Sequence, residues 1–201
     1  MPDYDITRKS RPVVVIPYQP QWVSDFTQIA VRIRDVVNTA AIRIDHIGST
    51  AVPGLAAKDV IDIQITVIDL GRVDTLTKSL IAVGFRQGTT FEHDEFHGKP
   101  ETDTELRKLY MREPEGERRV HIHIREIGRF NQKYALLFRD CIRASEVVRK
   151  EYELLKQRAA QLFPDSIDGY LYLKEPVFHI ICETALLWAE KVRWIAGEEY
   201  L

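Results

Sequence analysis

Two segments of the chain alternate apolar and polar side chains with the two-residue period of a β-strand. They are residues 60–68 and residues 118–126. Because successive side chains of a strand point to opposite faces, each segment predicts a strand with one apolar and one polar face. The apolar faces carry Ile61, Ile63, Ile65 and Val67 in the first segment, and Val120, Ile122 and Ile124 in the second. The polar faces carry Asp62, Gln64 and Thr66 in the first, and Arg119, His121, His123 and Arg125 in the second.

Other segments complete the predicted set of elements. Shorter strands are predicted at 13–16, 41–47 and 106–112, and the turn EPEGE joins the last of them to the strand at 118–126. Helices are predicted where apolar side chains recur at every third or fourth position. Residues that suit a helix start precede these stripes. They are Pro20, Asp69, Asn131, Ser145 and Ser166.

The order of these elements predicts an α+β fold: a mixed β-sheet flanked by helices, with a C-terminal helical section. The sheet-containing core would span about residues 12–128 and the helical section about residues 130–197, within a single domain over residues 1–201. A chain of this length suits one domain. Pro176 lies inside the last predicted helix and is expected to kink or restart it, because proline lacks a backbone N–H. The polar segment 87–105 is predicted to be one long loop.

Composition narrows the functional classes. The net charge is −2, so the chain as a whole lacks the basic character of a nucleic-acid or membrane-surface protein. A local basic patch stays open as an alternative, around Arg107, Lys108, Arg112, Arg118 and Arg119. No apolar run approaches the ~18 residues of a membrane span, and the N-terminus has no signal-peptide core, so we expect a cytoplasmic protein. Cys141 and Cys182 fall on apolar helix positions and are expected to be buried thiols.

The motif HIGST at residues 46–50 follows a predicted strand. Gly48 permits an unusual backbone angle, and Ser49 and Thr50 offer hydroxyl and backbone N–H groups. If a helix begins at this turn, its N-terminus would favour an anion such as phosphate. The alternative is a tight turn or helix cap without a ligand.

Asp62 stands between two isoleucines within a predicted strand, where aspartate is disfavoured. A carboxylate in a sheet must be solvated, paired or bound to a cation. An ion pair with Arg43 or Arg119 would satisfy it structurally. A Mg²⁺ site is the functional alternative, because Mg²⁺ favours one or two carboxylates together with substrate phosphates.

His121 and His123 project from one face of a strand. If this strand lies near residues 60–68, both imidazoles converge with Asp62. The three side chains could hold a metal ion, grip phosphate oxygens or supply a general base. Lys58 and Lys174 could reach phosphate at the same place, or be surface lysines that extend into solvent.

The loop at 87–105 contains residues of the kinds that bind metals: His93, Asp94, Glu95 and His97. Imidazole and carboxylate groups suit divalent ions. A charged loop exposed to water, without a metal, is the alternative explanation.

Several motifs together resemble the GrpB family over nearly the whole chain. The longest is HIGSTAVPGLAAK, which is followed by VIDI. The resemblance continues in VVIPYQPQW (14–22), HIH (121–123), LLFRDCIR (136–143), YELLK (152–156), and Tyr170, Lys174 and Phe178.

This resemblance implies a fold of the nucleotidyltransferase type, akin to the DNA polymerase β-like superfamily. In that superfamily a Gly-Ser turn holds the triphosphate, two acids on the next strand bind Mg²⁺, and a later strand supplies a third acid. Gly48 and Ser49 match the turn and Asp62 matches the first acid. The second acid position holds Gln64, and His121 or His123 corresponds to the third. Asp59 stands where the family would have proline, on the other face of the strand from Asp62.

Two hypotheses follow. One is an enzyme that transfers a nucleotidyl or phosphoryl group with a divalent metal, Mg²⁺ or Mn²⁺, held by Asp62 and a histidine. The other is a binding module for a nucleotide or phosphorylated small molecule, because one assured carboxylate gives little charge for two metal ions. A scaffold that retains the fold alone is a third option. Some members of the family are fused to dephospho-CoA kinase, which implies nucleotide or coenzyme chemistry.

Overall fold

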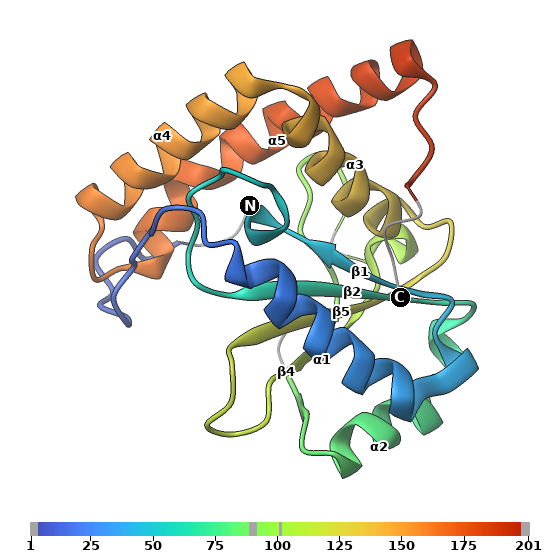
Figure 1. Ribbon diagram of the computed structural model, residues 1–201. Coiled ribbons are helices and arrows are strands. Elements are labelled where there is room, and N and C mark those ends of the chain that lie inside the picture. Colours follow the sequence, from blue (N-terminus) through green and yellow to red (C-terminus); the bar gives the residue numbers. More distant parts are fainter. Residues whose placement is uncertain (1–3, 89–91, 101, 198–201) are drawn as a thin grey trace.

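Five strands of the described residues form one mixed β-sheet (Figure 1). The structure is a computed structural model that describes residues 4–88, 92–100 and 102–197. The strands are β1 (Arg43–Ile47), β2 (Ile61–Val67), β3 (Arg86–Gln87), β4 (Leu109–Arg112) and β5 (Val120–Glu126). Their order across the sheet is β1-β2-β5-β4-β3, with β2 and β5 parallel and the other neighbours antiparallel.

The pairing of β2 with β5 aligns the polar positions of the two strands. The paired residues, in order along the strands, are Asp62–His121, Gln64–His123 and Thr66–Arg125. Paired residues of neighbouring strands point to the same face of a sheet. The two polar rows predicted from the sequence therefore lie side by side on one face.

The apolar rows of β2 and β5 pack on the opposite face against two helices, α1 (Gln21–Val37) and α2 (Asp74–Ala82). Ile63 of β2 and Ile33 of α1 are both fully buried in this layer. Burying one such side chain stabilises the fold by roughly 1.5–3 kcal/mol. Figure 1 shows α1 and α2 below the sheet, so these two helices cover its apolar face.

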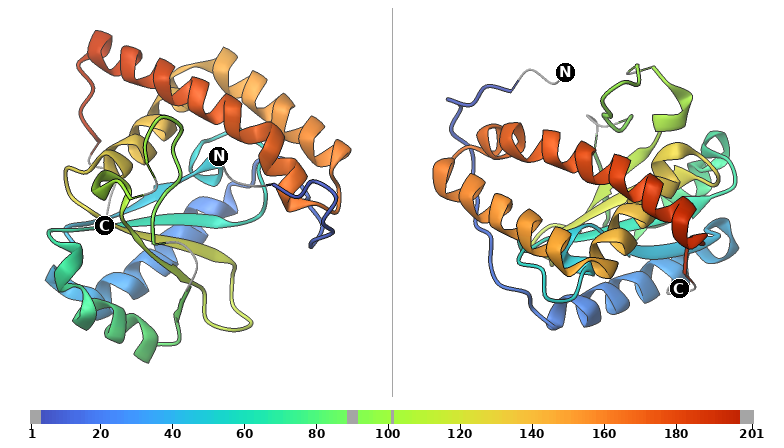
Figure 2. Two further views of the ribbon diagram at one scale, coloured as in Figure 1. Left: turned by 180° about the vertical axis from the view of Figure 1, so that it is seen from behind. Right: turned by 90° about the horizontal axis from the view of Figure 1, so that it is seen from above.

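Three further helices lie over the polar face of the sheet. They are α3 (Phe130–Ala144), α4 (Glu146–Leu162) and α5 (Ile167–Val192). α4 and α5 contact each other along their length, and α3 lies between them and the sheet (Figure 2). Their own apolar cluster includes Phe138, Tyr152 and Cys182. This layer covers only part of the polar face.

The predicted α+β fold, with its mixed sheet, flanking helices and helical C-terminal section, is confirmed. Ser145 and Ser166 are the N-caps of α4 and α5, as predicted, since their hydroxyls accept hydrogen bonds from Val148 N and Gly169 N. The predicted strand at 13–16 is wrong, because within it only Ile16 makes an isolated bridge, to Ala57.

Three details of the helices differ from prediction. Asn131 does not cap α3, which begins one residue earlier; its side chain donates instead to buried acceptors. Asp69 caps a short 3-10 turn rather than α2. Pro176 does not restart α5, which runs continuously from Ile167 to Val192, while the alternative expectation of a kink at Pro176 stays a prediction.

The two cysteines, Cys141 and Cys182, are both buried and free, as predicted. Of the predicted loop at 87–105, residues 89–91 and 101 lie outside the described residues. Even α5, which has 26 residues, lacks the sustained apolar character of a bilayer-spanning helix, and the same holds for the other described helices.

Candidate functional site

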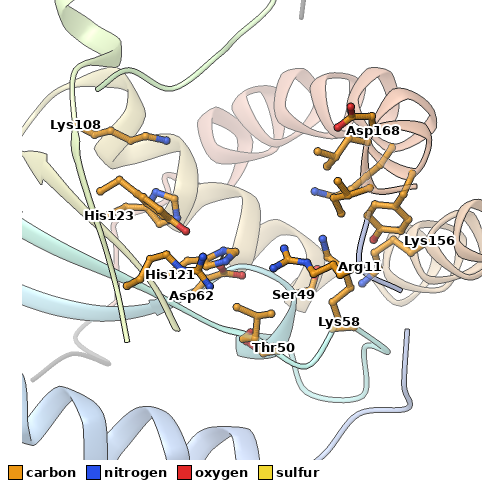
Figure 3. Close-up of a pocket in the computed structure, with 18 residues that line it drawn as sticks. Arg11, Ser49, Thr50, Lys58, Asp62, Lys108, His121, His123, Lys156 and Asp168 are labelled. Carbon is orange, nitrogen blue, oxygen red and sulfur yellow. The ribbon is translucent and has the colours of Figure 1, made fainter. Parts of the chain in front are cut away.

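A cavity of about 580 Å³ opens on the uncovered part of the polar face, between the HIGST turn and the start of α5 (Figure 3). Six cationic side chains line it: Arg11, Lys58, Lys108, Arg112, Lys156 and Lys174. Two carboxylates line it, Asp62 and Asp168, together with His121 and His123. The whole chain carries a slight negative charge, whereas this cavity has a marked excess of positive groups. We call it the cationic cleft.

The turn after β1 is shaped by the approach of Asp62. Gly48 has φ = 71°, a left-handed conformation that favours glycine. A Cβ atom at this position would also collide with the Asp62 carboxylate oxygen Oδ2. The glycine of HIGST is therefore required both by the backbone angle and by the neighbouring acid.

The residues after Gly48 form a 3-10 turn of three residues, Ser49–Ala51, and not an α-helix. The condition for a helix N-terminus at this motif is therefore not met. The Thr50 hydroxyl donates to the Val60 carbonyl at 3.1 Å and lies 3.0 Å from His46 Nε2. Thr50 thus fixes the turn, while Ser49 lines the cleft beside the Tyr152 hydroxyl.

His46 supports the turn as a neutral side chain. Its ring is buried and stacks on Phe26, with ring centroids 4.7 Å apart. Burial lowers the pKa of His46 to about 3, although Asp62 opposes this shift. The neutral imidazole can form its hydrogen bond with Thr50 without adding a positive charge beneath the cleft.

Asp62 pairs with His121 across the two parallel strands. Asp62 Oδ1 lies 3.3 Å from His121 Nδ1, and the side chains are 27% and 25% exposed. Burial alone would raise the pKa of Asp62, but the hydrogen bond and charge of His121, with Lys58 and Lys174, hold it below its ordinary value. Arg43, one structural partner considered from the sequence, forms a two-bonded pair with Asp45. Asp62 is therefore an ionised carboxylate at the cleft wall.

The predicted lysines both lie at the cleft. Lys58 is enclosed, with Nζ 4.8 Å from the centre of the Tyr170 ring. Burial, followed by the charge of Lys174, lowers the pKa of Lys58 to about 7. Lys156, on α4, also has its pKa lowered to about 7, first by burial and then by Lys174. Ammonium groups that repel one another in this way would be stabilised by a bound anion.

His123 lies deeper in the cleft wall than His121. Its Nδ1 atom is buried and has no hydrogen-bond partner among the described residues. Burial, followed by the charges of Arg125 and Lys108, lowers the pKa of His123 well below its ordinary value. Among the described residues, Asp62, His121 and His123 do not bring three ligand atoms within 4.8 Å of one another. They share the cleft without forming a compact three-ligand set.

Gln64 occupies the position of the superfamily's second acid, and its side chain is engaged in a buried hydrogen-bond network. Gln64 is fully buried, accepts a 2.7 Å hydrogen bond from Arg125 and donates to the Gln132 carbonyl at 3.1 Å. Arg125 also donates two hydrogen bonds to Asp94. We call Gln64, Arg125 and Asp94 the buried polar network.

These residues do not fit a pair of divalent ions. Asp62 is the one carboxylate on the β2–β5 side of the cleft, and Asp168 comes from the start of α5, on the opposite side (Figure 3). Two divalent ions need several negative ligands. A single ion shared between Asp62 and substrate phosphates is compatible with the site.

The loop residues proposed as metal ligands separate into different roles. Asp94 is buried in the network and pairs with Lys108 at 2.6 Å, so it does not face water. His93 forms an isolated β-bridge with Arg107. His97 contacts Glu175, away from Asp94.

Several cleft residues were not identified from the sequence as site residues. Lys108 and Arg112 belong to the local basic patch described in the sequence analysis, and this patch is the sequence feature that indicates them. Lys156 lies one helical turn after Tyr152, so the two residues share one face of the helix, and Tyr152 is buried. A lysine on a buried face is unusual, and this is the signal that indicates Lys156. Arg11 and Asp168 carried no such signal, because long-range folding brings them to the cleft.

The chain belongs to the GrpB family: the family model described as GrpB protein matches residues 12–184. The crystal structure of conserved protein GrpB from Enterococcus faecalis is similar to this structure, with a TM-score of 0.74 and 30% identity, over 88% of this chain and 99% of that one. A UPF0157 protein of Halalkalibacterium halodurans is 31% identical, over 86% of this chain and 82% of its own length.

Other relatives are longer proteins. The dephospho-CoA kinase of Mycolicibacterium paratuberculosis is 34% identical over 91% of this chain, but the match spans 48% of the relative. This chain therefore corresponds to about half the length of that curated relative. The family membership expected from the sequence motifs is confirmed.

Proposed function

We propose that the cationic cleft binds a nucleotide or another phosphorylated small molecule and transfers its nucleotidyl or phosphoryl group to an acceptor hydroxyl. The observation that carries this proposal is the lining of the cleft, where six lysine and arginine side chains outnumber two carboxylates, although one of the six, Lys108, is paired with Asp94. Phosphate oxygens are the ligands best suited to such a set of lysines and arginines. The geometry supports side-chain binding of the phosphates by Lys58, Lys174 and Ser49.

The pair of Asp62 and His121 is suited to act on the acceptor. The carboxylate at 3.3 Å favours the imidazole tautomer that carries hydrogen on Nδ1, which leaves Nε2 as a base. In the proposed step the acceptor oxygen bonds to phosphorus and its proton passes to His121 Nε2. The bond from phosphorus to the leaving phosphate oxygen breaks, and that oxygen keeps the bonding electrons. The lysines of the cleft neutralise the charge that develops there.

We include one divalent ion, Mg²⁺ or Mn²⁺, in this proposal. Asp62 would hold it, together with oxygens of the substrate and, for Mn²⁺, a nitrogen of His123, since both nitrogens of His121 are engaged in the proposed step. Such an ion supplies positive charge to the phosphate oxygens. Gln64 would not take part, because its amide is already engaged on both sides in the buried polar network.

The test is a reaction panel with purified protein, four nucleoside triphosphates and dephospho-CoA, each with Mg²⁺, Mn²⁺ or EDTA, followed by mass spectrometry of products. Dephospho-CoA is included because relatives named dephospho-CoA kinase match this chain over part of their length. We expect turnover with at least one substrate, reduced at least a hundredfold in both His121→Gln and Asp62→Asn. Arg32→Gln, far from the cleft in an exposed ion pair, is the control. Turnover that survives both cleft substitutions would contradict the assignment.

The alternative is a binding module that does not catalyse transfer. It is favoured by Gln64, since the second acid position holds an amide that is fixed to Arg125. A ligand that binds only the folded state raises the melting temperature. If the same panel raises the melting temperature of the wild type but not of Lys58→Gln, and yields no product, the binding module is the correct description.

A further inference from the structure

Three potential metal ligands converge outside the cationic cleft. His97 comes from the segment before β4, whereas Glu175 and His179 lie one helical turn apart on α5. One ligand atom from each of the three residues lies within 4.8 Å of the other two, and the described residues contain no other such group of three. We call these residues the His-Glu-His cluster.

The distances in the cluster suit a metal ion. Glu175 Oε1 lies 3.5 Å from His97 Nε2 and also 3.5 Å from His179 Nε2. Two ligand atoms that are each about 2.1 Å from a tetrahedral ion lie about 3.4 Å apart. One carboxylate oxygen is therefore placed beside two imidazole nitrogens at about the spacing that zinc coordination requires.

His179 gives an independent indication that a ligand is needed. The side chain is buried, with 8% of its surface exposed; its Nδ1 atom has no hydrogen-bond partner among the described residues, and its Nε2 atom has the 3.5 Å contact with Glu175 Oε1. A buried polar atom without a partner is unfavourable, so a ligand at this position would stabilise the fold. His97 stacks on His179 with ring centroids 3.9 Å apart, so the two imidazoles lie together beside Glu175.

The surroundings would orient the ligands. Tyr4 forms a side-chain hydrogen bond with Glu175, which fixes the carboxylate from the outer side. Phe96 contacts the His179 ring edge-on, with centroids 4.7 Å apart. Hydrogen bonds and packing around the ligands of this kind are typical supports of metal sites.

We propose that His97, Glu175 and His179 form a binding site for one transition-metal ion of the Zn²⁺ type, which ties the segment before β4 to α5. Two imidazoles and one carboxylate are a common protein ligand set for zinc, and they leave a fourth position for water. Mg²⁺ and Ca²⁺ are disfavoured, because both prefer oxygen ligands. This site is separate from the proposed transfer reaction, and its test does not depend on that activity.

The test is calorimetric titration of the EDTA-treated full chain with Zn²⁺, with Co²⁺ absorption as a report of tetrahedral coordination. We expect one equivalent to bind, and His97→Ala and Glu175→Gln each to weaken its affinity at least tenfold. His97 is 34% exposed and Glu175→Gln preserves shape, so both variants should fold. Melting temperature with and without Zn²⁺ gives a second measurement.

Two matched controls separate this site from other histidines. His93→Ala removes a histidine of the same segment that lies outside the cluster, and Asp62→Asn removes the carboxylate of the cleft. The proposal requires the equivalent lost in His97→Ala to remain in both controls. Zinc binding that is unchanged in His97→Ala and Glu175→Gln, or that disappears in Asp62→Asn, would overturn it, as would the absence of any binding to the wild type.

Discussion

The polar face of the sheet carries two arrangements that differ sharply although they lie only two residues apart on β2 and four residues apart on β5. At one of them, Asp62 and His121 are each about a quarter exposed and face the cationic cleft. At the other, Gln64 and Arg125 are buried, and Arg125 is held by Asp94. The residue types are similar in both places, but one arrangement is open to a ligand and the other is closed.

The difference arises from what covers each arrangement. Gln64 lies under the start of α3, where the Gln132 carbonyl accepts its hydrogen bond. Asp62 instead faces a turn whose glycine leaves the carboxylate uncrowded. A buried charge must be paired, whereas a charge at a cleft can remain available for a ligand. We infer that the buried polar network stabilises the fold, whereas the pair of Asp62 and His121 takes part in the proposed transfer reaction.

The largest effect on stability is expected in the buried polar network. Asp94→Ala leaves the charges of Arg125 and Lys108 buried without their carboxylate. Removing one partner of a buried ion pair costs about 3–5 kcal/mol in the free energy of unfolding. Urea denaturation of the variant and the wild type measures this difference.

An exposed ion pair provides the control for Asp94→Ala. Arg32 and Glu117 pair at 2.7 Å, but their side chains are 41% and 46% exposed. Glu117→Ala should therefore change the free energy of unfolding by less than about 1 kcal/mol. If the two variants lose similar stability, the network has no special structural role.

A smaller loss is expected at the open end, from Gly48→Ala. The added methyl group meets both a positive φ and the Asp62 carboxylate, so the turn must shift. We expect a loss of about 2–3 kcal/mol, made up of about 1–2 for the backbone angle and the remainder for the contact. Gly54→Ala is the matched control, since φ is 77° and no atom lies within 4 Å of the added Cβ. An equal loss of stability in both variants would show that contact between the added methyl group and Asp62 has no measurable cost.

The fold and the arrangement of Asp62 and His121 at the cleft could be predicted from the sequence. Alternation along 60–68 and 118–126 placed the apolar rows in the core, and the pairing of Asp62 with His121 follows from two polar rows on one face. The GrpB motifs pointed to Gly48 and Ser49. The placement of these residues could be predicted because it depends on residue spacing within a strand, a turn or a family motif, whereas their roles stay predictions.

The buried polar network could not be predicted, because it depends on contacts between segments that are distant in the sequence. Nothing near Asp94 in the sequence indicates that it pairs with Arg125, which is 31 residues away. The same limit applies to Arg11 and Asp168, which reach the cleft from opposite ends of the chain. The 3-10 turn at Ser49 was also not foreseen, since the motif alone does not distinguish it from the start of an α-helix.

A pH-dependent change of about fivefold in anion affinity at the cleft is expected if one lysine gains a proton, and of about 25-fold if two do. Lys58 and Lys156 have pKa values lowered to about 7. Above pH 7 these groups are neutral in the empty protein and must take up protons when a phosphate binds. The affinity for inorganic triphosphate should therefore fall between pH 7 and pH 8, by about a factor of five for each lysine that gains a proton. Calorimetry at several pH values, in two buffers that differ in ionisation enthalpy, measures affinity and proton uptake together.

The stability of the protein without a bound anion should rise with pH because of Lys58. Between about pH 7 and the ordinary lysine pKa of 10.5, the unfolded chain binds more protons at Lys58 than the folded chain does. Stability contributed by this group therefore rises with pH across that window, and the penalty of the buried charge is complete below pH 7. Lys58→Gln should flatten both the stability profile and the affinity profile. Profiles identical to the wild type would contradict the assignment of Lys58.

The smallest effect on stability is expected from Asp62→Asn, which removes the charge of the open pair and preserves its shape. The pair with His121 is separated by 3.3 Å and is partly exposed, so solvent weakens its contribution. We expect a change of less than about 1 kcal/mol in urea denaturation, although transfer activity should be lost. Asp94→Asn provides the matched comparison at the closed arrangement, where the same chemical change leaves Arg125 and Lys108 without a counter-charge and should cost several times more. Equal costs for the two variants would mean that Asp62 is also a structural carboxylate, and the cleft would then lose its principal candidate for chemistry.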